Sequence, residues 1–187
     1  MRLVLFVFPL AVGLGYLLGG RLRHLAEVRF RHGWAGLAGI AVQFVPARGT
    51  VGTVVLLASF TLLVFVAVVN LRLPGFPLVM GGLCLNFLVI AVNQGMPVTR
   101  EAIIASDQAE SLPSLAREGG TKHHLATDQD DLLFLGDVIG IPAPVRQAVS
   151  VGDIAAYAGA VWLVVARMRR PDARPAPEPA PAAEVSG

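Results

Sequence analysis

Residues 51–71, VGTVVLLASFTLLVFVAVVNL, form an apolar run without a charged side chain. A bilayer core of about 30 Å takes about 20 such residues as a helix. Unpaired backbone groups are too costly in lipid for any other form, so a membrane helix is predicted here. Residues 76–94 are a second run, entered through Pro74-Gly75-Phe76-Pro77. So short a turn predicts a tight antiparallel hairpin.

The rest of the chain has the same apolar character. Of 187 residues, 55% are hydrophobic and 15% are charged, and the mean hydropathy is +0.65. These values favour an all-α class, a polytopic membrane helical bundle with about five transmembrane helices and one extracytoplasmic loop. The predicted membrane domain, 1–168, has its spans at 3–20, 33–47, 51–71, 76–94 and 148–166, with the outer loop at 95–147. Residues 169–187 are rich in Pro and Ala and predict a disordered cytoplasmic tail.

Arginines give the sidedness, because short cytoplasmic loops carry an excess of Lys and Arg. Five spans with the N-terminus outside and the C-terminus cytoplasmic put nine of the fifteen basic residues inside, namely Arg21, Arg23, Arg29, Arg31, Arg72, Arg167, Arg169, Arg170 and Arg174. The second span, 33–47, reaches only about 22 Å as a helix. Four spans would put the last arginine cluster outside, so five are expected, in the cell membrane.

Apart from Asp153 at the outer end of the last span, the polar side chains inside the predicted spans are uncharged, which argues against a pump or an ion-coupled transporter. Asn86 and Asn93 are seven residues apart on one helical face. They either line a polar crevice with Gln94 or, as we expect, hydrogen-bond to a neighbouring helix. Small residues four apart predict packing seams within the bundle, at Gly15 and Gly19, Ala35 and Gly39, and Ala155 and Gly159. Cys84 is interpreted as a small buried hydrophobe.

The loop contains the residues with the most chemistry. Lys122-His123-His124-Leu125 is followed by Asp128, Asp130 and Asp131, a pattern that could bind a metal or perform acid–base chemistry. Adjacent histidines in an extended segment point to opposite faces, which leaves one His and one Asp. That is fewer than the ligands zinc needs, so no metal and no cofactor are predicted.

Two acidic residues follow a glycine in the later part of the chain. Asp137 lies in the apolar stretch 132–142 and is expected to be a turn residue that bonds its own backbone. The alternative is a carboxyl group with a raised pKa in an apolar setting. Asp153 lies three residues after Ser150, a spacing typical of a capping box at the start of the last helix.

Four blocks of this sequence resemble a known family. They are Met96-Pro97-Val98, Lys122-His123-His124-Leu125, Phe134-Leu135-Gly136-Asp137-Val138-Ile139-Gly140-Ile141-Pro142 and Val149-Ser150-Val151-Gly152-Asp153-Ile154. They look like the recurrent blocks of a bacterial multi-span membrane family, common in actinobacteria and clostridia, whose function is unknown. The resemblance covers roughly residues 1–168 and implies no activity. Gly140 departs from it, because a proline is expected there.

Three functions are compatible with these residues. The first is a non-enzymatic binding or accessory protein whose outer loop takes a ligand or partner. The second is a small oligomeric transporter or channel component for a neutral solute. The third is a membrane-surface enzyme that pairs His124 with Asp137. The candidate ligand-binding residues at the outer mouth are Asn86, Asn93, Gln94, Lys122, His123, His124, Asp137 and Asp153. Expected partners are the lipid bilayer and a second copy or another membrane protein; nucleic acid is not expected.

Overall fold

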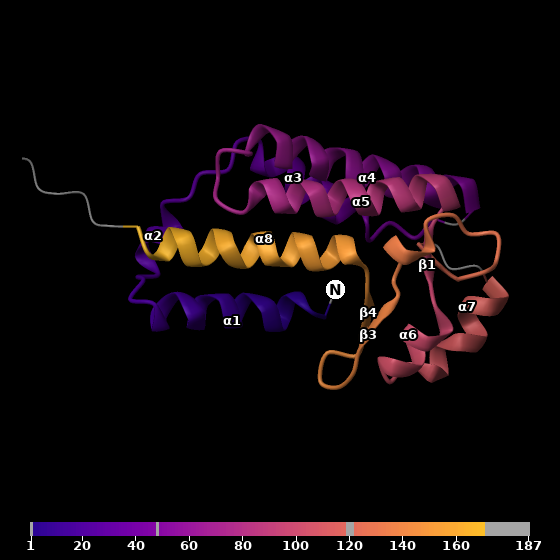
Figure 1. The fold of residues 1–187 in the computed structure, drawn as a ribbon. Coiled ribbons are helices and arrows are strands. Elements are labelled where there is room, and N and C mark those ends of the chain that lie inside the picture. Colours follow the sequence, from indigo (N-terminus) through magenta and orange to yellow (C-terminus); the bar gives the residue numbers. More distant parts are fainter. Residues whose placement is uncertain (1, 48, 119–121, 171–187) are drawn as a thin grey trace, which may run out of the picture.

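Five apolar helices and a small mixed subdomain make up this protein in the computed structural model, which describes residues 2–47, 49–118 and 122–170 (Figure 1). The predicted tail therefore lies almost wholly outside the described residues. The apolar helices are α1 (Val4–Leu17), α3 (Gly33–Val42), α4 (Gly49–Val69), α5 (Phe76–Asn93) and α8 (Val151–Met168). One more short helix, α2 (Arg23–Ala26), joins α1 to α3.

The apolar helices pack as a curved row in the order α1, α8, α5, α4 and α3. Their directions follow from contacts at their ends. The Thr53 hydroxyl donates to the Gln94 carbonyl at 2.8 Å, so α4 begins where α5 ends. The Asn70 side chain bonds the backbone of Arg31, so α3 begins where α4 ends. The chain thus runs back and forth along one axis, with the loop subdomain at one end (Figure 1).

Glycines bring α5 and α8 close together. A Cβ added at Gly82 would lie 2.2 Å from the Gly152 carbonyl oxygen, and one at Gly159 would lie 2.5 Å from the Gly75 carbonyl oxygen. The predicted seam at Ala155 and Gly159 is confirmed for Gly159. The rest of this contact, which is formed by Gly75, Gly82 and Gly152, was not predicted.

The other two predicted seams each contain one close glycine. Gly15 of α1 faces Met168 of α8, whereas a Cβ at Gly19 would meet nothing within 4 Å. Gly39 of α3 faces α4, where the Ser59 hydroxyl donates to the Gly39 carbonyl at 2.8 Å. All three seams lie within the chain, as expected of small residues that let helix backbones approach.

Two helices are shorter than predicted. Helix α1 ends at Leu17, because Gly19 adopts a positive φ of 77° and the Gly20 amide bonds the Gly15 carbonyl. Helix α3 ends at Val42. If the helix continued, the ring of Pro46 would clash with the Val42 carbonyl four residues before it. Within the described ranges, three helices, α4, α5 and α8, are long and apolar enough to cross a membrane.

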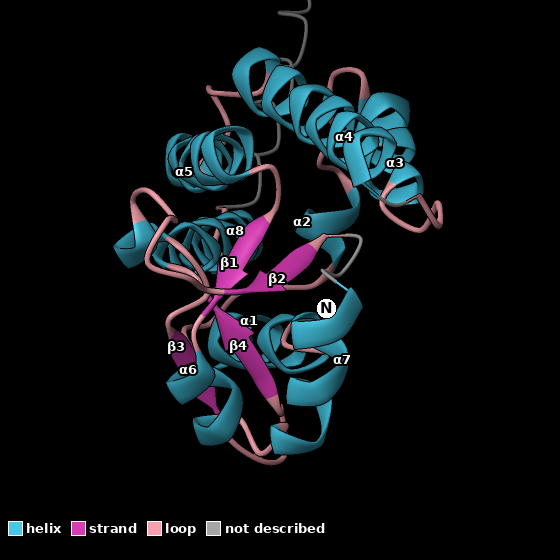
Figure 2. Cartoon of the chain, turned by 90° about the vertical axis from the view of Figure 1, so that its right-hand side faces the viewer, coloured by secondary structure: helices cyan, strands magenta, loops and turns pink. Residues whose placement is uncertain are grey.

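Residues 95–118 and 122–149, here called the loop subdomain, are folded rather than extended. Strand β1 (Met96–Val98) pairs in parallel with β2 (His123–Leu125), and β3 (Ile139–Ile141) pairs antiparallel with β4 (Gln147–Val149). Between them lie α6 (Arg100–Ala105), η1 (Ala109–Ser111), α7 (Leu112–Glu118) and η2 (Leu133–Leu135). Figure 2 shows the strands in front of the helix ends. The apolar stretch 132–142 contains η2 and β3.

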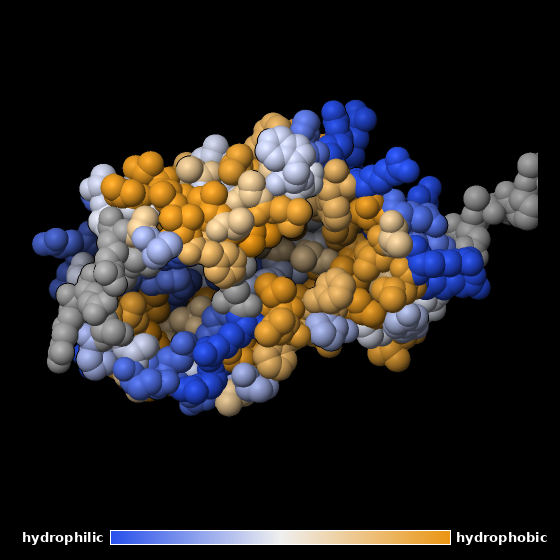
Figure 3. Space-filling model, turned by 180° about the vertical axis from the view of Figure 1, so that it is seen from behind, coloured by the Kyte–Doolittle hydropathy of each residue, from blue (hydrophilic) through white to orange (hydrophobic). Residues whose placement is uncertain are grey.

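Large apolar side chains cover much of the outer surface of the helices. Leu5, Leu17, Trp34, Leu37 and Phe44 are each at least 70% exposed. In Figure 3 hydrophobic side chains cover the middle of one face, and hydrophilic ones gather toward both ends. Cys84 is exposed on this surface, which corrects the interpretation of a buried thiol. The opposite side of α5, at Gly82 and Asn86, is the one that packs on α8.

Candidate functional site

Asp137 is held beside β1 at the junction of the loop subdomain and the helices. Its amide donates to the Pro97 carbonyl at 2.9 Å, and its carbonyl accepts from the Thr99 amide at 3.2 Å. On the other side of β1, His123 is in register with Met96. This arrangement puts His123 Nε2 3.5 Å from Asp137 Oδ2.

The carboxyl group of Asp137 is buried and incompletely hydrogen-bonded. The residue is 4% exposed, and Oδ1 has no hydrogen-bond partner. The expected turn that bonds its own backbone is therefore wrong, and the alternative of an apolar setting is correct. Burial raises the pKa of Asp137 to about 8, and the nearby Asp153 carboxylate acts in the same direction. Asp137 is therefore protonated at pH 7.

His123 connects this buried acid to the surface. Half of its side chain is exposed, whereas that of Asp137 is 6% exposed. Desolvation of the ring, together with the neighbouring Lys122 charge, lowers the pKa of His123. Both members of the pair are consequently uncharged at pH 7, and a proton on Asp137 has an imidazole nitrogen next to it.

Asp153 belongs to a network that joins α5 to α8. Ser150 and Asp153 form the predicted capping box, which is confirmed. Asn86 Nδ2 donates to Asp153 Oδ1 at 2.7 Å, and the Ser150 hydroxyl donates to Asn86 Oδ1 at 2.9 Å. The expected interhelical bonds of Asn86 are confirmed. The bond from Ser150 to Asn86 was not predicted, because the cap pattern involves residues of one helix only.

His124 faces away from this cluster, as the alternation along β2 predicts. Its Nε2 lies 2.7 Å from Asp130 Oδ1, and Asp130 Oδ2 accepts from the Thr127 amide. Although burial opposes it, the bonds from Thr127 and His124 lower the pKa of Asp130. The proposed pairing of His124 with Asp137 is wrong, because the other histidine of the doublet points to β1 and Asp137.

The remaining predicted residues stabilise the junction. Asn93 Nδ2 donates to the Asp131 carbonyl and Asn93 Oδ1 accepts from the Asp131 amide, at 2.8 Å each. Gln94 ends α5 with a φ of 57°. Lys122 Nζ lies 5.9 Å from the centre of the Phe44 ring. Asn86, His123, Asp137 and Asp153 thus lie at one junction. The other predicted residues, His124, Asn93, Gln94 and Lys122, make contacts outside it.

Metal-binding geometry is not present in the described part of the chain, where no group of three or more His, Cys, Asp or Glu side chains could hold an ion. The junction offers instead a neutral carboxylic acid with an unpartnered oxygen, a neutral imidazole and an amide–carboxylate pair. Such a set can hold a proton and form hydrogen bonds with a polar group.

All of these residues lie within one family match. A family model described as Family of unknown function (DUF5317) matches residues 28–165. The chain belongs to this family. No curated protein and no solved structure matches the chain. This DUF5317 protein therefore belongs to a family without an assigned activity.

Proposed function

We propose that this DUF5317 protein crosses the cell membrane five times and binds a small ligand or a partner side chain at the junction of its loop subdomain with the helices. It does so as a binding or accessory protein and not as an enzyme. The observation that carries the proposal is the buried, unpartnered Oδ1 of Asp137 next to the half-exposed His123.

Five crossings are supported by the direction of the helices. Lys122 lies over Phe44, so the chain after the short α3 lies beside the loop subdomain. At the opposite end, the Arg21 amide donates to the Met168 carbonyl, so the ends of α1 and α8 meet there. Helix α3 is short, about 15 Å long, and residues 43–47 continue from its end toward the loop subdomain, where Phe44 meets Lys122. A bilayer thins locally around a short span at modest cost.

An outer position for the loop subdomain is supported by charge. The helix ends away from it carry the exposed arginines Arg21, Arg23, Arg29, Arg31, Arg72, Arg169 and Arg170. Loops with such an excess stay in the cytoplasm. The loop subdomain then faces the exterior, where a ligand can reach His123.

Ligand binding is supported by the unfavourable free energy of leaving Asp137 Oδ1 buried without a hydrogen bond. A buried polar atom without a hydrogen bond destabilises a protein by about 1–3 kcal/mol. A ligand that donates to Asp137 Oδ1, or accepts its proton, would remove that cost. The polar group of such a ligand can approach Asp137 from solvent beside His123, because the His123 side chain is half exposed.

Photo-cross-linking tests this function. Benzoylphenylalanine is introduced at Lys122, next to His123, and at Gln129 as a control on another turn of the loop subdomain. In native membranes we expect an adduct, seen as a discrete mass increase, at position 122 and not at 129. The adduct should disappear with Asp137→Asn and persist with Asp130→Asn. No adduct at position 122, or one that Asp137→Asn leaves unchanged, would contradict binding at this junction.

A further inference from the structure

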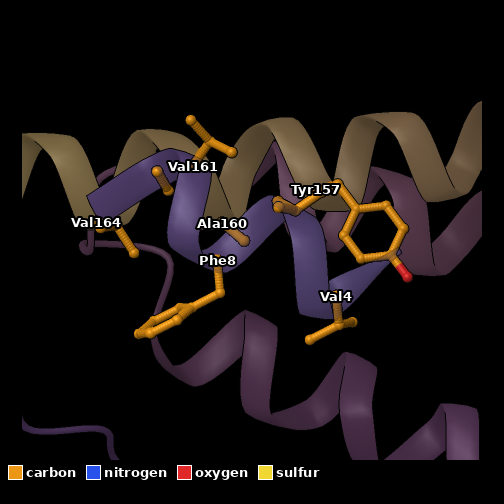
Figure 4. Close-up of a pocket in the computed structure, with 8 residues that line it drawn as sticks. Val4, Phe8, Tyr157, Ala160, Val161 and Val164 are labelled. Atoms are coloured by element: carbon orange, nitrogen blue, oxygen red, sulfur yellow. The ribbon is translucent and has the colours of Figure 1, made fainter. Parts of the chain in front are cut away.

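The curved row of helices leaves a groove between α1 and α8. Its lining is wholly apolar and its volume is about 130 Å³. Val4 and Phe8 project from α1, and Tyr157, Ala160, Val161 and Val164 from α8 (Figure 4). Two of its lining residues, Val4 and Phe8, are exposed, so the groove is open on the outer surface of the helices.

Arg167 lies on α8 where this groove approaches the arginine-rich end. It follows Val164 by three residues and Ala160 by seven, a spacing that puts all three toward one side of the helix. Arg167 Nε is buried and has no hydrogen-bond partner. A guanidinium nitrogen in this state lacks an acceptor that phosphate or carboxylate would supply.

More positive charge surrounds that end of the groove. The connection between α1 and α3 carries Arg23, Arg29 and Arg31, all exposed, and Arg169 and Arg170 follow α8. An apolar groove that ends among arginines is complementary to a molecule with a hydrocarbon chain and an anionic head.

We propose that the groove between α1 and α8 binds one anionic glycerophospholipid, with an acyl chain along Val4, Phe8 and Val161 and its phosphate at Arg167. The inference rests on the membrane placement proposed above and is independent of the Asp137 junction. A helix of a second copy is about 10 Å across, which is too wide to enter a groove with a volume of about 130 Å³. A hydrocarbon chain is far narrower.

Lipid titration followed by native mass spectrometry tests the site. The full chain is purified in a neutral detergent and titrated with phosphatidylglycerol or with phosphatidylcholine of the same acyl chains. We expect phosphatidylglycerol to bind at least about tenfold more tightly. It has a net negative charge that can pair with Arg167, whereas the choline group neutralises the phosphate charge of phosphatidylcholine. Arg167→Gln should remove this preference, whereas Arg169→Gln, at the exposed end of the same helix, should change it less than about twofold.

A second variant fills the groove without touching the arginine. Ala160→Leu should weaken the binding of both lipids. Asp137→Asn should leave the binding of both unchanged, which distinguishes this site from the Asp137 junction. Equal binding of the two lipids by the wild type, or equal losses with Arg167→Gln and Arg169→Gln, would overturn the proposal. A protein that is dimeric and becomes monomeric with Ala160→Leu would assign the groove to a second copy instead.

Discussion

Gly82→Ala is expected to destabilise the protein by about 2–4 kcal/mol, near the upper end for an overpacked contact. The new Cβ would lie 2.2 Å from the Gly152 carbonyl oxygen and 2.7 Å from the Ala156 amide nitrogen. Backbone atoms cannot rotate away, so α5 and α8 must separate. That movement also breaks the bond between Asn86 and Asp153. Unfolding by SDS in mixed micelles, followed by circular dichroism, measures the loss.

Gly81→Ala is the matched control. It adds the same methyl group one residue earlier on α5, where nothing lies within 4 Å. Its effect should be neutral or slightly stabilising, since alanine favours a helix over glycine. Equal destabilisation by the two substitutions would show that α5 and α8 do not meet through Gly82.

Asp137→Asn is expected to stabilise the protein at pH 8 and to remove part of its pH dependence. The carboxyl pKa is 3.8 in the unfolded chain and about 8 in the folded protein. The folded state therefore holds the proton more tightly. The contribution of the protonated Asp137 carboxyl to the free energy of unfolding is complete below pH 3.8 and is lost as the pH rises toward 8. The slope is about 1.4 kcal/mol per pH unit, or on the order of 5 kcal/mol over the whole window.

Stability of both proteins is compared between pH 5 and 8.5 by the same SDS titration. The difference between wild type and Asp137→Asn cancels every other titrating group. At pH 8 the variant should gain about 2–4 kcal/mol, since its amide is itself incompletely hydrogen-bonded. Asp130→Asn, at a carboxyl whose pKa is lowered, should lose stability instead. If the stability of the wild type and of Asp137→Asn changed with pH in parallel, Asp137 would be in contact with water and this account would be contradicted.

The long helices could be predicted from the sequence because their signal is local. Helices α4 and α5 follow from uncharged apolar runs, and α8 from its Ser150 and Asp153 cap. The ends of α1 and α3 were less predictable. They depend on whether Gly19 adopts a positive φ and on how far before Pro46 the helix must stop, which hydropathy does not record.

The candidate site could be predicted in composition but not in its pairing. Asn86, His123, Asp137 and Asp153 were all identified as polar residues in unusual places. Which histidine meets Asp137 depends on the parallel register of β1 with β2, two segments 25 residues apart or more. No local pattern specifies that register. The close contacts of Gly75, Gly82 and Gly152 were missed for the same reason, because a close approach involves two helices.

Cysteine labelling in intact cells tests the central claim, that five crossings put the loop subdomain outside. Single cysteines are introduced at Ala47, Asp128, Arg29 and Arg72 in a Cys84→Ala background and treated with a membrane-impermeant maleimide. The cysteines at 47 and 128 should react in intact cells, and those at 29 and 72 only after permeabilisation. Reaction at 128 only after permeabilisation, or at 47 and 128 from opposite sides, would contradict the account.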